Sequence, residues 1–387
     1  MTKNIPLSIP CVQGNEWKYI KECLDTGWVS SVGSFVNRFE DQLAEYVGTE
    51  HAVAMVNGTA AIHIALMLAG IQPEDEVIVP ALTFVSPVNC VKYIGAHPVF
   101  MDVEPDYWQI DTAKLADFLE KECAWKSGKL YNKHTERRVT GIIPVDLLGH
   151  PSDIDTILEL AKKYGLKVIE DATESLGAEY KGAEVGSQAP VACFSFNGNK
   201  IITTGGGGML VTNNAEFAEK ARYLSQQAKD DPIEYIHNEI GYNYRLTNIQ
   251  AAMGCAQLEQ LDSYVGKKRE IASFYTEHLK DVPGVRCPEE AIWARSTFWL
   301  YTILIDEKKY GMSSRELLKK LQEEKIQTRP LWHPLHKLKP FKNEFAYFPD
   351  TAEHLCCEAL SIPCSVSLDA VSMHRIATSI KKFAAEA

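Results

Sequence analysis

Four consecutive glycines, residues 205–208, separate two apolar runs and constrain the fold more than any other feature of the sequence. The first run, residues 191–196, predicts a strand that leads into a polar turn containing Lys200, and the second run, residues 209–212, predicts another strand. Because glycine has no side chain, four in a row indicate positive φ angles or a backbone that approaches a neighbouring group closely. Lys200 therefore lies beside a tight turn between two predicted strands.

The turn allows two interpretations of Lys200. In a crowded, partly desolvated pocket a lysine loses its proton readily and attacks a carbonyl carbon, as Schiff-base formation requires. On a solvated loop the same lysine has no chemical role, and most lysines are exposed. The residue alone does not decide between them.

A strand, a glycine turn and a helix follow one another in residues 51–69. Residues 51–56 predict the strand, Asn57-Gly58-Thr59 the turn, and the alanine-rich residues 60–69 the helix. Such a junction directs free backbone N–H groups and the positive end of the helix dipole towards an anion, which suggests a phosphate site. The alternative is an ordinary junction in which Thr59 caps the helix.

Strands and helices alternate through the following hundred residues. The strands are expected at residues 76–79, 98–103, 141–145 and 167–170, with helical segments such as 154–164 between them. This alternation predicts a mostly parallel sheet covered on both faces, with ligands at the carboxyl ends of its strands. The polar or aromatic residues expected at those ends are Gly58, Thr59, Thr83, Phe84, Asp146, Asp171, Glu174, Ser195 and Lys200.

Asp171 closes the apolar run Lys-Val-Ile-Glu-Asp, so the sequence delivers a carboxylate from a buried strand to the ligand edge. Burying a carboxylate costs several kcal/mol unless a positive partner is present. A protonated pyridine nitrogen would be such a partner, and a structural capping role is the alternative.

The pattern of predicted elements changes after Pro232. Residues 249–280 show a long helical pattern that reads as a connector, followed by a strand at 298–305, a helix at 313–324 and a strand at 326–329. We expect a large α/β domain at residues 1–261, with a lead-in at 1–50, and a smaller α+β domain at 262–387.

Charge and composition exclude several classes of protein. A net charge of −11 argues against general affinity for nucleic acid or anionic lipid. The sequence shows neither a signal-peptide pattern nor an apolar run of about 20 residues, so a cytoplasmic protein is expected. The ten cysteines contain no CxxC pair, and His333 and His336 have no adjacent carboxylate, so no metal site is predicted.

One reactive lysine, one buried acid and one anion site match the needs of pyridoxal phosphate. Five motifs carry a closer resemblance: NGTAAIHIAL, PALTFVSPVNCV, EDATESLGA, FSFNGNKIITTGGGGMLVT and GYNYRLTNIQAAMGCAQL. They resemble, in order, the DegT/DnrJ/EryC1/StrS family of sugar-nucleotide aminotransferases. The resemblance covers nearly the whole chain and implies a fold-type I transferase with a mostly parallel seven-stranded sheet and a smaller C-terminal domain.

The resemblance also implies roles for single residues. Lys200 would be the Schiff-base lysine and proton carrier, and Asp171 the partner of the pyridine nitrogen. The phosphate would be held by Gly58, Thr59 and Ser195.

Further roles concern the rim of the site. Phe84 would stack on the cofactor ring, and Asn243 would reach the phosphate from a neighbouring subunit, which implies a homodimer with shared active sites. Glu174 and Asn57 depart from the glutamine and serine common in relatives, which affects the expected hydrogen bonds near the ring. Arg329 and His333 are candidate sugar-nucleotide contacts, or local packing residues.

The implied reaction moves an amino group from L-glutamate to the C4 keto group of a nucleotide-linked sugar. The lysine motif most resembles the branch acting on UDP-linked 4-keto-6-deoxy-N-acetylhexosamines in bacterial surface-glycan synthesis. Two alternatives remain: a pyridoxamine-dependent sugar dehydratase, whose representatives replace the lysine with histidine, and a non-catalytic regulatory protein of the same fold.

Overall fold

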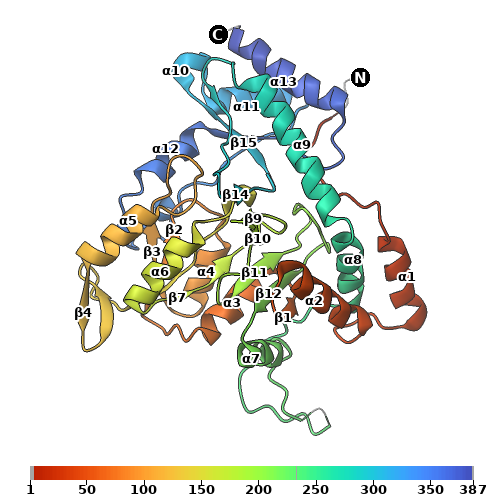
Figure 1. The fold of residues 1–387 in the computed structure, drawn as a ribbon, viewed down its shortest axis with the longest axis vertical. Helices are drawn as coiled ribbons and strands as arrows, with labels where there is room; N and C mark the ends of the chain where they lie inside the picture. Colours follow the sequence, from red (N-terminus) through yellow and green to blue (C-terminus); the bar gives the residue numbers. More distant parts are fainter. Residues whose placement is uncertain (1–3, 232, 386–387) are drawn as a thin grey trace.

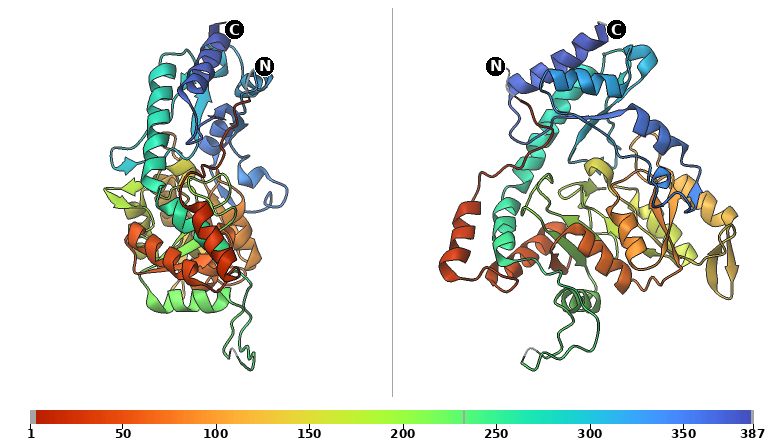
Figure 2. Two further views of the ribbon diagram at one scale, coloured as in Figure 1. Left: turned by 90° about the vertical axis from the view of Figure 1, so that its right-hand side faces the viewer. Right: turned by 180° about the vertical axis from the view of Figure 1, so that it is seen from behind.

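The computed structural model describes residues 4–231 and 233–385, which form a broad part and a narrower part (Figure 1). The long helix α9 (Leu261–Leu279) runs from the broad part into the narrow one. Both ends of the drawn chain lie at the narrow part, as the two views in Figure 2 also show. No described helix is long and apolar enough to cross a membrane.

The broad part is built on two hydrogen-bonded ladders that continue into each other. Bridges between Val145 and Asp171, and between Ile169 N–H and the Ile142 carbonyl (3.1 Å), join them. The first ladder has the order β1 (His51–Met55), β12 (Gly208–Thr212), β11 (Ala192–Ser195), β8 (Glu170–Asp171). The second has the order β17 (Ala346–Tyr347), β3 (His97–Met101), β2 (Glu76–Pro80), β6 (Val139–Ile142), β7 (Lys167–Val168).

All neighbouring strands in these ladders are parallel except those next to β12, which is antiparallel to both β1 and β11. With β7 and β8 taken as one interrupted strand, the described residues give the seven strands that were predicted, and β17 adds an eighth at the edge. The predicted mostly parallel sheet is therefore confirmed.

The apolar sequence of the strands and one glycine explain this arrangement. Every residue of β2 and of β12 is buried, as expected for strands covered on both faces. A Cβ atom at Gly208 would lie 2.4 Å from the carbonyl carbon of Asn57. Only glycine therefore allows β12 to begin against the turn that follows β1.

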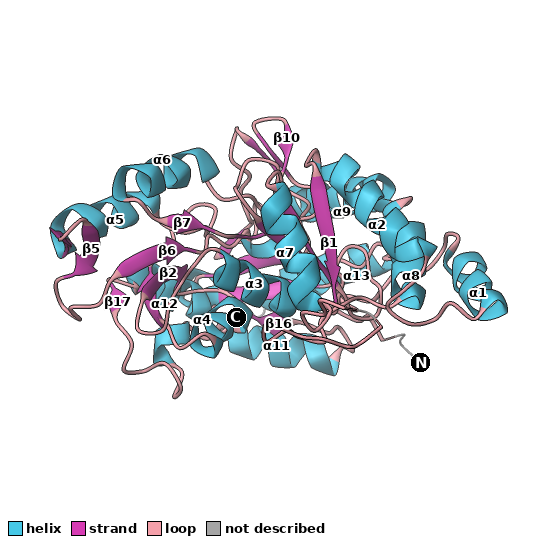
Figure 3. Ribbon diagram, turned by 90° about the horizontal axis from the view of Figure 1, so that it is seen from below, coloured by secondary structure: helices cyan, strands magenta, loops and turns pink. Residues whose placement is uncertain are grey.

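Helices cover both faces of the sheet. Figure 3 shows α5 and α6 on one side of the strands and α3 and α4 on the other. Their bounds are α3 (Gly58–Leu68), α4 (Ser86–Tyr93), α5 (Thr112–Asp117) and α6 (Ile154–Tyr164). The other helices of the broad part are α1 (Glu16–Thr26), α2 (Ser34–Val47), α7 (Ala215–Ser225), α8 (Asn248–Leu258) and α12 (Asp350–Glu358).

The narrow part has its own antiparallel sheet and core. The strand order is β13 (Val285–Arg286), β15 (Tyr301–Ile305), β18 (Ala359–Ile362), β16 (Arg329–Pro330). Helices α9, α10 (Glu307–Tyr310), α11 (Ser314–Glu323) and α13 (Ala370–Ala385) accompany it. The first turns of α9 pack in the core of the broad part and its later turns in the core of the narrow part, and Ile5 also lies in the narrow part. The division at residues 261 and 262 stays a prediction.

Three local predictions were wrong in detail. The strand expected at residues 326–329 is limited to β16, while Ile326 forms only an isolated bridge with Ile5. The helical pattern at 249–280 forms two helices, α8 and α9, because the chain breaks at Glu259 and Gln260. The strand expected from residue 298 begins at Tyr301, since Phe298 has a φ of +48°. Remaining short elements are η1 (Phe118–Glu122), β4 (Cys123–Lys126), β5 (Lys129–Asn132), η2 (Leu147–Gly149), β9 (Glu179–Tyr180), β10 (Ala183–Glu184), β14 (Ala294–Arg295) and η3 (Leu335–Lys337).

Candidate active site

A cavity of about 230 Å³ opens at the carboxyl ends of β1, β8 and β11. It brings together six of the predicted site residues, which are Gly58, Thr59, Phe84, Glu174, Ser195 and Lys200. Its other lining residues are Asn57, Ser86, Thr173, Asn197, Asn199, Gly206, Gly207, Trp299 and Trp332. Segments far apart in the sequence therefore meet where the strand alternation placed a ligand site.

The beginning of α3 forms one wall of the cavity. The helix starts at Gly58, and the side chain of Asn57 caps it by accepting a hydrogen bond from Ala60 N–H at 2.7 Å. The alternative in which Thr59 caps the helix is therefore wrong; Thr59 Oγ1 instead lies 2.5 Å from Ser86 Oγ. The first N–H groups of a helix have no acceptor within it, so this wall offers donors to an anion.

Lys200 projects from the loop between β11 and β12. Its side chain is 14% exposed, and its Nζ lies 3.7 Å from Glu174 Oε1 and 4.1 Å from the centre of the Trp299 ring. The backbone N–H of Lys200 is bonded to the Asn197 carbonyl at 3.0 Å, which folds the loop back on itself. The solvated-loop interpretation of Lys200 is therefore wrong, because the amine lies between an acid and an indole.

Two buried acids accompany the lysine. Asp171 is 2% exposed at the end of β8, and its Oδ1 accepts a hydrogen bond from Thr173 N–H at 3.2 Å. Burial raises the pKa of Asp171, while the Thr173 hydrogen bonds and the charge of Lys200 oppose the rise. Burial also raises the pKa of Glu174 to about 7, again opposed by Lys200. Glu174 can therefore hold or release a proton near neutral pH.

A strained turn holds Glu174 in place. Glu174 Oε2 accepts a hydrogen bond from Leu148 N–H at 2.9 Å, and Leu148 has a φ of +59°. The next residue, Gly149, has a φ of +91°, and a Cβ there would lie 2.2 Å from Thr297 Oγ1. Glycine is thus needed both for the turn and for its contact with the segment that precedes β15.

His150 fastens this turn to the loop before β14. Its Nε2 accepts a hydrogen bond from Ala291 N–H at 3.1 Å, so Nδ1 carries the ring proton and donates it to the Pro151 carbonyl at 2.8 Å. The ring also stacks on Tyr107, with centroids 5.1 Å apart. Burial lowers the pKa of His150 from 6.5 to about 4, so the folded protein holds this ring neutral.

The neutral ring makes stability fall in mild acid. Below pH 6.5 the unfolded chain binds a proton at His150, whereas the folded protein keeps the ring neutral. We therefore expect this group to lower the free energy of unfolding by about 2 kcal/mol at pH 5. The loss should begin below pH 6.5 and be complete below about pH 4. Urea unfolding from pH 5 to 8 tests this, since His150→Gln should flatten the dependence on pH. Parallel curves for the two proteins would contradict the assignment.

Four predicted residues do not line the cavity: Asp171, Asn243, Arg329 and His333. Asn243 is exposed on the strand-like segment that bridges to Gln226, and Arg329 is exposed on β16 with its guanidinium on the Thr328 carbonyl at 2.9 Å. His333 is exposed beside Trp332, which does line the cavity. Asp171 is 2% exposed and is not among the lining residues. No cluster of potential metal ligands occurs in residues 4–231 or 233–385.

Several lining residues were not foreseen, most notably Ser86, Trp299 and Trp332. Ser86 lies inside the motif PALTFVSPVNCV and Trp332 directly precedes the candidate residue His333, so their polar or aromatic character was the available signal. No sequence signal pointed to Trp299, because its contact with Lys200 depends on how two distant segments pack. Phe84, 51% exposed, meets Trp332 edge-on with centroids 6.1 Å apart.

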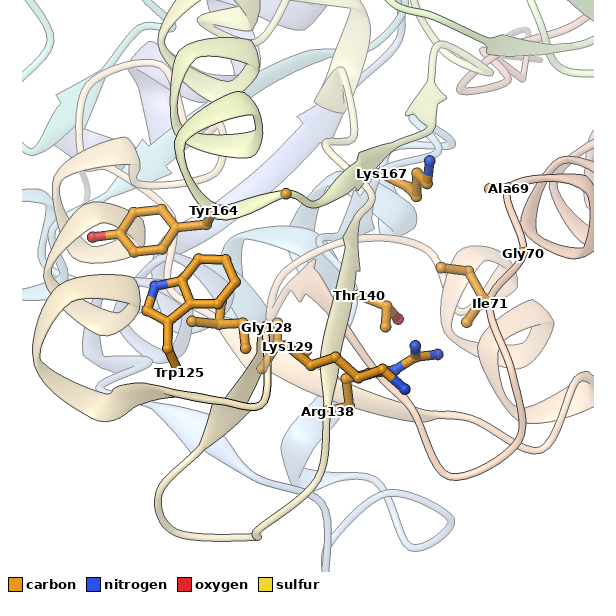
Figure 4. A pocket seen from close by; sticks show the side chains of 13 residues that line it. Ala69, Gly70, Ile71, Trp125, Gly128, Lys129, Arg138, Thr140, Tyr164 and Lys167 are labelled. Carbon is orange, nitrogen blue, oxygen red and sulfur yellow. The ribbon is translucent and has the colours of Figure 1, made fainter.

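A second hollow of about 230 Å³ lies at the amino ends of β6 and β7 (Figure 4). Trp125, Arg138, Tyr164 and Lys167 line it, and none of the predicted site residues does. The guanidinium of Arg138 is occupied by Asp75, with contacts of 2.7 and 2.5 Å. This hollow is at the opposite ends of the strands from the cluster of acids and Lys200.

The whole chain is similar to known sugar aminotransferases. The profile of the DegT/DnrJ/EryC1/StrS aminotransferase family matches residues 10–381. The GDP-perosamine synthase of Caulobacter vibrioides is 40% identical over 375 residues, covering 96% of both chains. The GDP-perosamine synthase of Escherichia coli O157:H7 is 38% identical over 381 residues, covering 98% of this chain and 99% of that one. A solved DegT DnrJ EryC1 StrS aminotransferase from Brucella abortus has a TM-score of 0.85 at 31% identity, over 95% of both chains.

Proposed function

The chain belongs to the DegT/DnrJ/EryC1/StrS aminotransferase family and is a pyridoxal phosphate-dependent sugar aminotransferase of fold-type I, and from this premise we propose its substrates and residue roles. It would move an amino group from L-glutamate to the C4 keto group of a nucleotide-linked 4-keto-6-deoxyhexose. The observation that carries the proposal is the position of Lys200 Nζ, 3.7 Å from Glu174 and beside the beginning of α3.

The residues of the cavity fit the cofactor. A Cβ at Gly58 would lie 3.0 Å from both Ser195 Cβ and Thr173 Cγ2, so the glycine keeps clear the space in front of the helix N–H groups. Gly58, Thr59 and Ser195 would hold the phosphate, and Phe84 would cover the ring. Asp171, buried below, would keep the ring nitrogen protonated. The cofactor, once bound, supplies a protonated ring that accepts electrons.

Lys200 and Glu174 would handle the protons. Lys200 would attach the cofactor and carry the proton to and from the amino-bearing carbon. Glu174, with a pKa of about 7, would share a proton with the ring oxygen of the cofactor. Relatives often have glutamine at the position of Glu174. Trp299, whose ring centre lies 4.1 Å from Lys200 Nζ, would help to keep water from the amine.

The lysine motif and the whole-chain relatives point to different nucleotides in the sugar substrate. The lysine motif favours UDP-linked N-acetylhexosamines, whereas both relatives named above are GDP-perosamine synthases. We give precedence to a GDP-linked sugar, because those similarities extend over nearly the whole chain. Arg329 and His333 stay candidates for nucleotide-sugar contacts.

A substrate panel tests the proposal. The purified enzyme is supplied with pyridoxal phosphate, its visible absorption band is followed on adding L-glutamate, and GDP-, UDP- and dTDP-linked keto sugars are then added one at a time. We expect glutamate to shift the band and one sugar to restore it, with an amino sugar found by mass spectrometry. A sugar that loses a hydroxyl without gaining nitrogen would indicate the dehydratase alternative. A bound cofactor whose absorption band changes with none of the substrates would indicate the non-catalytic alternative.

The active enzyme would be a homodimer with shared sites. The loop between α7 and α8 projects from the broad part (Figure 1) and exposes Ile233 and Ile240 by 81% and 85%. Exposed apolar groups of this kind favour a protein partner, and a second copy is the commonest one. Asn243 follows this loop and lies outside its own cavity, whose Phe84 wall is half open to solvent.

Mixing two inactive variants tests the sharing. In a heterodimer of Lys200→Ala and Asn243→Ala subunits, one site carries both defects and the other carries neither. We therefore expect the mixture to regain up to about a quarter of wild-type activity after subunit exchange, from half the sites in half the dimers. A mixture no more active than the separate variants would argue against a contribution of Asn243 across the interface.

A further inference from the structure

We infer that Lys268 and Arg269, consecutive residues of α9, are positioning residues that hold the turn at residues 296–299 and thereby fix Trp299 against the reactive lysine. The inference rests on the proposed role of Lys200. It assigns a function to two basic residues that do not line the cavity.

The turn is strained and needs outside support. Phe298 has a φ of +48°, a conformation that a bulky side chain adopts only when its surroundings enforce it. One side of the turn is tied to Gly149, whose carbonyl accepts hydrogen bonds from Thr297 N–H at 2.9 Å and from Ser296 Oγ at 3.0 Å. These bonds place the turn beside Leu148 and Glu174 but do not involve the carbonyls of Ser296 and Trp299, of which the second also accepts a weak hydrogen bond from Cys364 Sγ at 3.4 Å.

Two basic side chains of α9 donate hydrogen bonds to the carbonyls of Ser296 and Trp299. Arg269 Nη1 donates to the Ser296 carbonyl at 2.6 Å, at the start of the turn. Lys268 Nζ donates to the Trp299 carbonyl at 2.7 Å, at its end. Hydrogen bonds from charged donors are about twice as strong as neutral ones. Both ends of the strained turn are thus clamped from the same helix.

Lys268 is the unusual member of the pair. It is 3% exposed, and its acceptors, the Trp299 carbonyl and Cys364 Sγ at 3.5 Å, are both neutral. Arg269, by contrast, also pairs with Glu290 at 2.5 Å. A buried ammonium without a carboxylate is costly in stability. Holding Trp299 is the use of that charge that the contacts indicate.

Trp299 fixes the position of Lys200 through two contacts. Its indole Nε1 donates to the Asn199 carbonyl at 2.7 Å, which fixes the residue next to the lysine. Its ring lies 4.1 Å from Lys200 Nζ. Displacing the backbone of Trp299 would therefore move both the loop and the wall that confines the amine.

The test compares Lys268→Met with Lys267→Met, a control one residue away whose side chain is 40% exposed and pairs with Glu270 at 2.9 Å. Misplacement of a reacting group by about 1 Å can cost 10²-fold in rate, so we expect Lys268→Met to lower kcat by about 10- to 100-fold while KM for the sugar stays within about threefold. Lys268→Arg, which keeps a charged donor, should recover most of kcat. Lys267→Met should match the wild type.

A second readout uses the cofactor-free protein and does not depend on turnover. Lysine labelling with an amine reagent, read by peptide mass spectrometry, should show Lys200 labelled faster in Lys268→Met than in the wild type, because the Lys200 side chain is only 14% exposed and the Trp299 ring lies against its Nζ. Trp299→Phe should give the same increase, and combining it with Lys268→Met should add little.

The outcomes separate the two proposals. Faster labelling of Lys200 alone, without any amino transfer in wild type, would support the clamp and refute the proposed reaction. Unchanged labelling together with unchanged kcat would overturn the clamp. Faster labelling of all buried lysines, with a lowered Tm, would show a merely structural role for Lys268 and would also overturn it.

Discussion

Lys200→Ala is expected to lower the rate of amino transfer by at least about 10⁴-fold, because one side chain would serve both as the attachment point of the cofactor and as the proton carrier. The substitution truncates a side chain that is 14% exposed and removes an amine that lies 3.7 Å from Glu174 Oε1. The folded protein should persist, since no hydrogen bond of the described residues uses Lys200 Nζ as a structural tie. The measurement is product formation with L-glutamate and the keto sugar identified by the panel.

Lys162→Ala is a suitable control, because Lys162 is an exposed residue of α6 and does not line the cavity. It should keep full activity. Turnover of Lys200→Ala within about tenfold of wild type would refute the proposed mechanism. Loss of turnover together with a lowered Tm would require Lys200→Arg as a second variant, which keeps the charge beside Glu174 but cannot lose its proton.

Local sequence patterns were sufficient to place Lys200, Asp171 and the turn before α3 at one edge of the sheet. Lys200 and Asp171 each follow an apolar strand, and the carboxyl ends of parallel strands meet at one edge of a sheet. The Asn57-Gly58-Thr59 turn was likewise located from the change of hydrophobic period. Only the identity of the capping residue was wrong, because both Asn57 and Thr59 have a suitable oxygen.

The parts that were missed depend on contacts between distant segments. Trp299 reaches Lys200 because Phe298 adopts a positive φ and Arg269 and Lys268 hold the carbonyls on either side. Neither the bend nor the clamp has a signature in the periodicity of residues 294–305. The break between α8 and α9 was missed for a related reason, since residues 249–280 keep a helical pattern through Glu259 and Gln260.

The raised pKa of Glu174 shows how such packing changes chemistry. The sequence placed Glu174 at the ligand edge of the sheet and, through the family resemblance, at a position where relatives often have glutamine, but it gave no sign of a raised pKa. Its burial, its fixed hydrogen bond from Leu148 N–H and its distance from Lys200 together make it a group that titrates near neutral pH. A glutamine at the same place could accept or donate a hydrogen bond but could not exchange a proton.

Asp171→Asn should lower amino transfer by about 10³-fold, the loss typical of removing one preorganised electrostatic contact from a buried site. Asparagine has nearly the same shape, so its Oδ1 can still accept the hydrogen bond from Thr173 N–H that Asp171 accepts at 3.2 Å. The change therefore removes the charge and leaves the local structure. Asp155→Asn is the control, because Asp155 is 48% exposed and pairs with Lys181 on the surface.

The stability of the cofactor-free protein distinguishes this loss from misfolding. Burial raises the pKa of Asp171 above its usual 3.8, so the carboxyl stabilises the fold below that pH and the contribution is lost as the pH rises through the folded value. Asp171→Asn does not titrate, so its Tm relative to wild type should increase as the pH is raised from 4 to 8. We thus expect an enzyme that is at least as stable near neutral pH and almost inactive. A variant that keeps turnover within about tenfold of wild type would show that Asp171 is only a buried structural acid.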